Sequence, residues 1–221
     1  AWAPENARGG DPLAASAPPP ELDWERWLGP HRWVPHYDER PTGDWRWIMS
    51  LGGGRVRDAG TQALAVALAV AGQTETTRFR VAAEGEAPDP AARYDVPPRL
   101  TATVEADGFL FDWSQPGPAE AGASGLRIQA GDTTRLTLDT LDDSAAEVAR
   151  ALEVWHTACR VREDRTRHLA VAAQAASLTA AINAAWRTGQ PLDLDLSNPE
   201  PTDNPAANAW LRPRARGPWR L

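Results

Sequence analysis

The stretch Leu100-Thr101-Ala102-Thr103-Val104-Glu105-Ala106-Asp107-Gly108-Phe109-Leu110-Phe111-Asp112-Trp113 decides the fold of this chain. It contains two runs that partly alternate between apolar and polar residues, Leu100–Ala106 and Phe109–Trp113. Alternation with a period of two is the pattern of a β-strand, and the Asp-Gly pair between the runs is typical of a tight turn. The stretch therefore predicts an antiparallel hairpin.

Short strand patterns flank this hairpin on both sides. They are predicted at Thr76–Ala82, Leu126–Gln129 and Thr134–Leu138. A second hairpin turn is predicted at Ala130-Gly131-Asp132, after a Gly/Pro/Ala-rich loop at 116–125. A last short strand is predicted where Leu192, Leu194 and Leu196 alternate with Asp193 and Asp195, which share one solvent-facing side.

Helical spacing of apolar residues predicts three helices. The first spans residues 60–71 and ends at Gly72, and the third spans about 164–187 and contains nine alanines. The second follows a capping box, Ser144-Ala145-Ala146-Glu147, and carries Val148, Leu152, Trp155 and Cys159 in one apolar row.

These elements predict an α+β fold, an open and mostly antiparallel β-sheet with helices packed on one face. Residues 1–20 are rich in proline, glycine and alanine and are expected to form an extended linker or strap. Residues 21–221 are expected to form one domain with an irregular C-terminal tail. The arginines of this tail are expected to pair with the protein's own carboxylates rather than with phosphates; they are Arg212, Arg214, Arg216 and Arg220. The chain begins Ala1-Trp2, so it is expected to be part of a longer product.

Composition excludes several classes of function. The net charge of −7 argues against nucleic acid or an anionic membrane as the main partner, and the longest apolar run, Ala63–Ala71, is too short to span a bilayer. The single cysteine excludes an internal disulfide, and the absence of lysine excludes lysine-dependent chemistry within these residues. A cytoplasmic location is favoured, with export open if a signal lies upstream.

A series of short motifs runs through the chain in a fixed order. It starts with Asp23-Trp24-Glu25-Arg26-Trp27-Leu28-Gly29-Pro30 and Trp45-Arg46 and continues with Gly52-Gly53-Gly54-Arg55-Val56-Arg57-Asp58. It ends with Trp155-His156 and Cys159-Arg160, then Ala207-Asn208-Ala209-Trp210-Leu211 and Arg216-Gly217-Pro218-Trp219. In order and spacing these motifs resemble the C-terminal domain of the glucose–fructose oxidoreductase/inositol dehydrogenase (Gfo/Idh/MocA) family, in its bacterial-type branch.

The resemblance implies an open antiparallel sheet that closes over a sugar or polyol and makes a homo-oligomer through the sheet face. It also implies NAD or NADP, held by an N-terminal Rossmann domain that these residues do not contain. That domain carries the family's catalytic lysine. By resemblance, Asp58 and Gln62 stand at the catalytic positions. Tyr37, Trp45 and Arg46 precede the glycine cluster and are expected to line the pocket and bind substrate.

Gln62 departs from the family pattern, which has histidine at this position. An aspartate and a histidine four residues apart share one face of a helix and both reach a substrate hydroxyl. Glutamine donates and accepts hydrogen bonds but does not carry a proton. Asp58 alternatively caps the 60–71 helix, as aspartates before helices usually do.

Two further groups of residues, the tryptophans and the histidines with Cys159, have structural explanations as well as functional ones. Five tryptophans between residues 21 and 47 offer sugar-stacking faces, but filling a loop-rich core or an interface explains them better. His31 and His36 with His156 and Cys159 would form a zinc site only if the two pairs meet.

Two hypotheses of different classes follow. The chain is the substrate-binding and oligomerisation domain of an NAD(P)-dependent sugar or polyol oxidoreductase. Alternatively, it is a non-catalytic carbohydrate-binding or assembly module, for which the replacement of the histidine by Gln62 argues.

Overall fold

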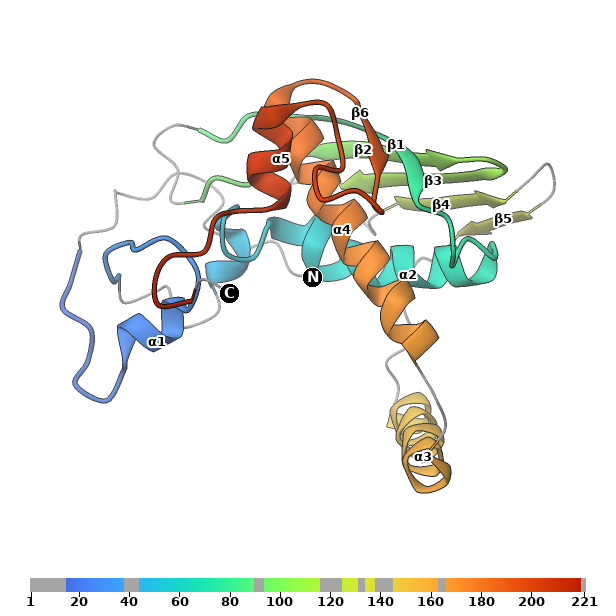
Figure 1. Ribbon diagram of the computed structural model, residues 1–221, viewed down its shortest axis with the longest axis horizontal. Helices are drawn as coiled ribbons and strands as arrows, with labels where there is room; N and C mark the ends of the chain where they lie inside the picture. Colours follow the sequence, from blue (N-terminus) through green and yellow to red (C-terminus); the bar gives the residue numbers. More distant parts are fainter. Residues whose placement is uncertain are drawn as a thin grey trace.

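The computed structural model describes residues 15–37, 44–89, 94–115, 125–130, 134–137, 145–162 and 166–219. Its centre is a sheet with the strand order β5-β4-β3-β2-β1-β6, in which every neighbouring pair is antiparallel. Figure 1 shows this sheet with the helices α2 and α4 on one side of it. The strands are β1 (Arg78–Gly85), β2 (Leu100–Ala106), β3 (Phe109–Gln115), β4 (Gly125–Ala130), β5 (Thr134–Thr137) and β6 (Leu192–Asp195).

The central hairpin of β2 and β3 forms in the predicted register. Ala106 pairs with Phe109 across the turn, and Gly108 takes the positive φ of 67° that the turn requires. Alternate residues of both strands are buried, as the sequence pattern predicts, so one face of the sheet is apolar and the other is largely polar. The α+β fold with an open antiparallel sheet covered on one face is confirmed.

Helices α2 (Thr61–Val70) and α4 (Thr166–Thr188) cover the apolar face. The small alanine side chains of α4 permit its close approach to the sheet, and the larger Leu178 and Ile182 are fully buried. By length and hydropathy alone, the Leu169–Thr188 part of α4 is long and apolar enough to cross a membrane, but half of that stretch is buried in the fold. This burial is the pattern of a core helix.

Helix α3 (Ala145–Val161) lies apart from the sheet, beyond the N-terminal end of α4 (Figure 1). Its contacts with other described helices and strands are sparse. Of its described side chains only Ala158 is buried. The predicted capping box includes Ser144, which lies outside the described residues.

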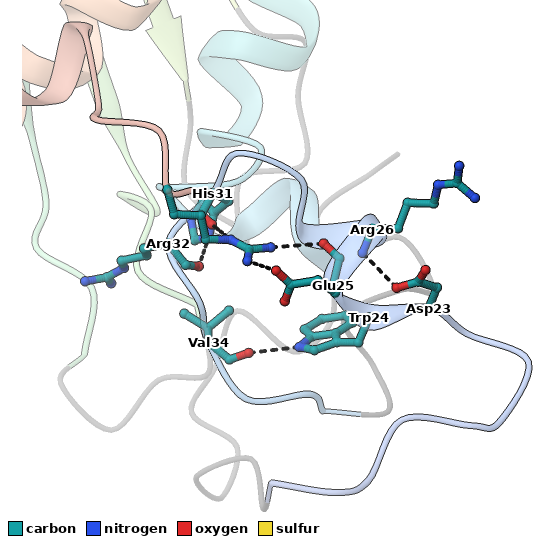
Figure 2. A network of polar contacts seen from close by, with 8 residues as sticks. Asp23, Trp24, Glu25, Arg26, His31, Arg32 and Val34 are labelled. Atoms are coloured by element: carbon teal, nitrogen blue, oxygen red, sulfur yellow. Dashed lines mark hydrogen bonds and ion pairs between the residues drawn. The ribbon is translucent and has the colours of Figure 1, made fainter. Parts of the chain in front are cut away.

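The segment before residue 38 forms a small lobe around α1 (Trp24–Leu28), shown in Figure 2. Trp24 is buried, stacks on Trp27 with ring centroids 4.6 Å apart, and donates a hydrogen bond to the carbonyl of Val34 at 2.9 Å. Arg216 fastens the C-terminal segment to this lobe through an ion pair with Glu25 and a 2.6 Å hydrogen bond to the carbonyl of His31. For Arg216, the predicted pairing of the basic tail with the protein's own carboxylates is confirmed.

The irregular tail predicted after residue 197 is wrong at one place. Helix α5 (Pro205–Leu211) begins there, because Asn204 caps it by accepting hydrogen bonds from the N–H groups of Ala206 and Ala207, and Pro205 occupies its first turn. An Asn-Pro pair at a helix start was a usable signal. The predictions for residues 1–14, the 116–125 loop up to residue 124, the turn at Gly131-Asp132 and Arg220 lie outside the described residues.

Candidate functional site

The glycine cluster packs tightly against Trp45-Arg46. These two residues belong to a short 3-10 helix, η1 (Asp44–Trp47). A Cβ atom built on Gly52 would lie only 2.4 Å from the Cα of Arg46, so a larger residue at position 52 would push the two segments apart. Gly53 and Gly54 both have positive φ, 70° and 71°, which L-residues adopt with strain. The cluster therefore fixes where Arg46 stands relative to the following helix.

That helix begins with a π-helical turn, η2 (Val56–Gly60), which continues into α2. Contacts with the sheet and with α4 hold this turn in place. Gly60 is buried beside the ring of Trp113 on β3, and the hydroxyl of Thr61 lies 2.9 Å from that of Thr179 on α4. π-helical turns inside α-helices are rare and occur frequently at functional sites. This one places Asp58 at the surface.

Asp58 faces Arg46 across the loop. The distance from Arg46 Nε to Asp58 Oδ1 is 3.9 Å, and the two side chains are 42% and 58% exposed. The Arg46 guanidinium also lies 5.3 Å from the ring centroid of Trp45, which is itself exposed. A long, exposed ion pair of this kind contributes at most about 1 kcal/mol, so a ligand can replace it at little cost.

The structure corrects the helix-cap interpretation of Asp58. The residues preceding η2 and α2 are Arg55 and Gly60, and neither helix has a side-chain capping hydrogen bond. Asp58 lies inside the π turn instead. Its carboxylate is therefore not used as a cap and points to the side where Arg46 lies.

Gln62 and Tyr37 are less closely tied to this cluster. Gln62 is exposed in the first turn of α2, and the π turn between it and Asp58 changes the regular helical spacing on which their shared face was predicted. Tyr37 is half-buried at the end of the lobe, and residues 38–43 between it and Trp45 lie outside the described part. The convergence of Gln62 and Tyr37 on Asp58 stays a prediction.

Sequence reasoning missed the support beneath the loop. Asn183 on α4 is buried and donates a 2.7 Å hydrogen bond from Nδ2 to the carbonyl of Gly53. Thr179, one turn earlier, holds Thr61. The available signal was a threonine and an asparagine four residues apart in an alanine-rich helix, where polar side chains need partners.

The histidines and Cys159 do not form a metal cluster. His36 is buried with its ring edge-on to Trp24, whereas Cys159 is exposed on α3. In the described ranges, three or more His, Cys, Asp or Glu side chains nowhere gather closely enough to hold a metal ion. The tryptophans divide between the two interpretations, because Trp24 fills the lobe's core while Trp33 and Trp45 are exposed.

A shallow open groove of about 590 Å³ lies elsewhere, where β1, β2 and β6 meet. Its charged side chains pair across the sheet, with Arg80 Nη1 2.7 Å from Asp193 Oδ1 and Arg78 Nε 3.5 Å from Asp195 Oδ2. The hydroxyl and N–H of Ser197, more than Arg78, lower the pKa of Asp195 below its ordinary value of 3.8. The two aspartates thus lie on the solvent-facing side of the edge strand, as predicted. The groove lies near the end of β2 that is farther from Trp113 and Asp58.

The chain was compared with protein-family models and with curated proteins. No family model matches it, and no curated protein matches it either.

Proposed function

We propose that this chain is the substrate-binding and oligomerisation domain of an NAD(P)-dependent sugar or polyol oxidoreductase. The observation that carries the proposal is the π-helical turn that presents Asp58 beside Arg46 and the exposed ring of Trp45. The motif series supports it, because Asp58 matches the aspartate of the Gfo/Idh/MocA pattern and Trp45-Arg46 matches its W-R motif before the glycine cluster.

The three side chains suit a polyhydroxylated ligand. The Asp58 carboxylate accepts hydrogen bonds from hydroxyl groups, and the Arg46 guanidinium donates to hydroxyl oxygens. The exposed indole of Trp45 offers an apolar face for the C–H side of a sugar ring. Together these groups can bind and orient a hydroxyl, and the exposed 3.9 Å pair between Arg46 and Asp58 is weak.

The described residues do not fit NAD(P). A dinucleotide binds where a parallel strand leads through a glycine-rich loop into a helix, whereas every described strand pair here is antiparallel and the glycine cluster follows a 3-10 helix. The space beside the glycines is already filled, since a Cβ on Gly53 would meet Arg57 and one on Gly54 would meet Val96. The cofactor of the proposed oxidoreductase belongs to a domain outside this chain.

A non-catalytic carbohydrate-binding or assembly module is the second candidate. Gln62 favours it, because an amide at the position of the expected histidine cannot take a proton from a bound hydroxyl. The two candidates share the ligand site and differ in proton transfer. In the full-length gene product, Gln62→His is expected to raise reduction of NAD⁺ or NADP⁺ by a sugar substrate if the first candidate is correct, and to leave it unchanged if the second is.

Self-association through the bare face of the sheet is part of the proposal. The described side chains there include Arg80, Thr103, Glu105 and Ser114, and the face is hydrophilic rather than apolar. Pairing through this face would therefore rest on hydrogen bonds and opposite charges. Replacement of Thr103 by arginine is expected to disrupt such an oligomer in light scattering, and an unchanged oligomer would exclude this face.

The binding site is tested by calorimetric titration of a panel of neutral sugars and polyols. Asp58→Asn and Arg46→Gln are each expected to weaken the best ligand about 10-fold or more, since hydrogen bonds to charged groups contribute about 1.5–3 kcal/mol. Asp193→Asn is the matched control, because Asp193 is also an exposed aspartate paired with an arginine. Equal losses in the control, or binding that survives both variants, would place the ligand elsewhere.

A further inference from the structure

Helix α4 holds both ends of the segment that carries Asp58. Thr179 and Asn183 are buried on this helix and lie one turn apart, so they share one side of it. Asn183 donates a 2.7 Å hydrogen bond to the carbonyl of Gly53, and Thr179 Oγ1 lies 2.9 Å from Thr61 Oγ1. Asp58 lies between Gly53 and Thr61 in the chain, so two neighbouring side chains of one helix fix the segment on either side of it.

The two threonine hydroxyls form a chain of hydrogen bonds that ends at the carbonyl of Arg57. Thr61 Oγ1 donates to that carbonyl at 2.7 Å. Each hydroxyl has only one hydrogen to donate, so the Thr61 oxygen accepts its second bond from Thr179. The distance of 2.9 Å between the hydroxyls is shorter than the 3.1 and 3.2 Å from Thr179 Oγ1 to the carbonyls of Ala175 and Ala176. The shortest contacts therefore run from Thr179 through Thr61 to Arg57.

The carbonyl of Arg57 lies within the π turn, where the backbone departs from α-helical bonding. In an α-helix this carbonyl would accept the N–H of Thr61, whereas a π turn bonds over five residues. Here the hydroxyl of Thr61 donates to it. The carbonyl belongs to the planar peptide unit that leads into Asp58, so holding its direction fixes the backbone at Asp58.

A threonine bond to the carbonyl four residues back does not by itself produce a π turn. Ser177 and Thr188 make the same kind of bond, at 2.9 and 2.8 Å, inside the regular helix α4. Thr61 differs because a second hydroxyl, from another helix, lies within hydrogen-bond distance of its own. The contribution of Thr179 is therefore what distinguishes this turn.

We propose that Thr179 is a positioning residue for the ligand site. Through the hydroxyl of Thr61 it holds the carbonyl of Arg57, and it thereby keeps the π turn in which Asp58 faces Arg46. A π turn contains one residue more than an α turn, so relaxation to α-helical geometry would turn the residues before it by about 100° around the helix axis. That rotation would take Asp58 away from Arg46. Since these two groups bind a ligand only in the proposed function, the role of Thr179 rests on that function.

NMR of the unliganded chain tests the hold on the turn. Thr179→Val removes the hydroxyl and is expected to shift the carbonyl resonance of Arg57 and the backbone resonances of residues 56–60. Thr179→Ser returns a hydroxyl and is expected to restore them. Thr188→Val is the matched control, because Thr188 is a threonine of the same helix whose hydroxyl bonds to carbonyls of that helix, and it is expected to leave residues 56–60 unchanged.

Calorimetric titration tests the consequence for binding, with neutral hexoses and polyols each titrated alone. Thr179→Val is expected to weaken the tightest binder about 10-fold, as loss of one hydrogen bond that orients a binding group would. Thr179→Ser is expected to regain most of the affinity, and Thr188→Val to keep all of it. Thermal unfolding accompanies each titration, because a merely structural threonine would lower Tm without changing the affinity of the folded protein.

Three outcomes would overturn the proposal. They are unchanged resonances at Arg57 and residues 56–60 in Thr179→Val, full affinity in that variant, and no recovery in Thr179→Ser. Failure of the proposed function has a different signature, because no sugar or polyol would then bind the unchanged chain. The NMR comparison needs no ligand and would still decide whether Thr179 holds the turn.

Discussion

Helices α3 and α4 follow each other in the chain but have opposite relations to the core. Helix α4 contains nine alanines among its 23 residues, and its inner side, with Leu178 and Ile182, is fully buried against the sheet. Helix α3 also carries large apolar residues, Leu152, Val154 and Trp155, but leaves them exposed. The comparison shows that large apolar side chains are buried only where the fold supplies neighbours to cover them.

The largest expected effect comes from removing equal side chains from the two helices. Leu178 on α4 is fully buried, so Leu178→Ala is expected to lower the free energy of unfolding by about 2–5 kcal/mol. Leu152→Ala on α3 removes the same atoms from an exposed position and is expected to change it by less than about 0.5 kcal/mol at low protein concentration. Urea unfolding measures both.

The size of the Leu152→Ala effect is the control for this pair. A large cost for Leu152→Ala would mean that α3 is packed against its own domain. The contrast between the two helices would then be wrong.

A smaller effect is expected from the polar residues of the same helices. Asn183→Ala removes the hydrogen bond to the Gly53 carbonyl, and the expected cost is about 1–3 kcal/mol, because that carbonyl loses a partner at a buried contact. Thr157→Ala on the exposed side of α3 is expected to be nearly neutral. Thermal unfolding compares the two.

The ligand site provides an additional readout for Asn183→Ala. Loss of support for the loop should weaken sugar binding at Asp58 even where the variant remains folded. Full affinity in a destabilised Asn183→Ala variant would show that the loop holds its shape without α4.

The smallest expected effect is on the free energy of unfolding at acid pH, and it comes from Asp195 on β6, the edge strand that follows α4. Because Ser197 lowers the pKa of Asp195 in the folded state below 3.8, the ionised carboxylate stabilises the fold above that pH. The stabilisation is lost as pH falls below 3.8 toward the folded pKa. The difference in the free energy of unfolding between Asp195→Asn and the unchanged chain should therefore become smaller in this acid range, as urea unfolding at several pH values would measure.

Asp195 is partly exposed, so this difference should be slight. Leu152→Ala serves as the comparison, because no carboxylate of the edge is altered in it. If the difference in free energy of unfolding between Leu152→Ala and the unchanged chain also became smaller at acid pH, the effect would not come from Asp195.

The sheet was predictable because its signal is local. Alternation in Leu100–Ala106 and Phe109–Trp113 reports which side chains face the core, and the Asp107-Gly108 turn sets the pairing. The exposure of α3 was not predictable, since an apolar helical row is the same in sequence whether or not the fold supplies something to cover it. The row that contains Cys159 predicted a helix correctly but says nothing of its surroundings.

The candidate site was predictable in part. The motif series placed Asp58, Arg46 and Trp45 together, and the structure brings these three close to one another. The π turn was not predictable, because it depends on Gly60 fitting against Trp113 and on Thr61 meeting Thr179 from a distant helix. Such contacts join residues far apart in the chain and leave no local pattern.

The attachment of Arg216 to the α1 lobe has a consequence in time. Glu25 and Arg216 are separated by 191 residues, and a ribosome adds about 5–20 residues per second. Arg216 is therefore synthesised roughly 10–40 s after Glu25. During that interval the lobe and its stacked tryptophans lack this ion pair, so the lobe is synthesised well before the contact that fastens it.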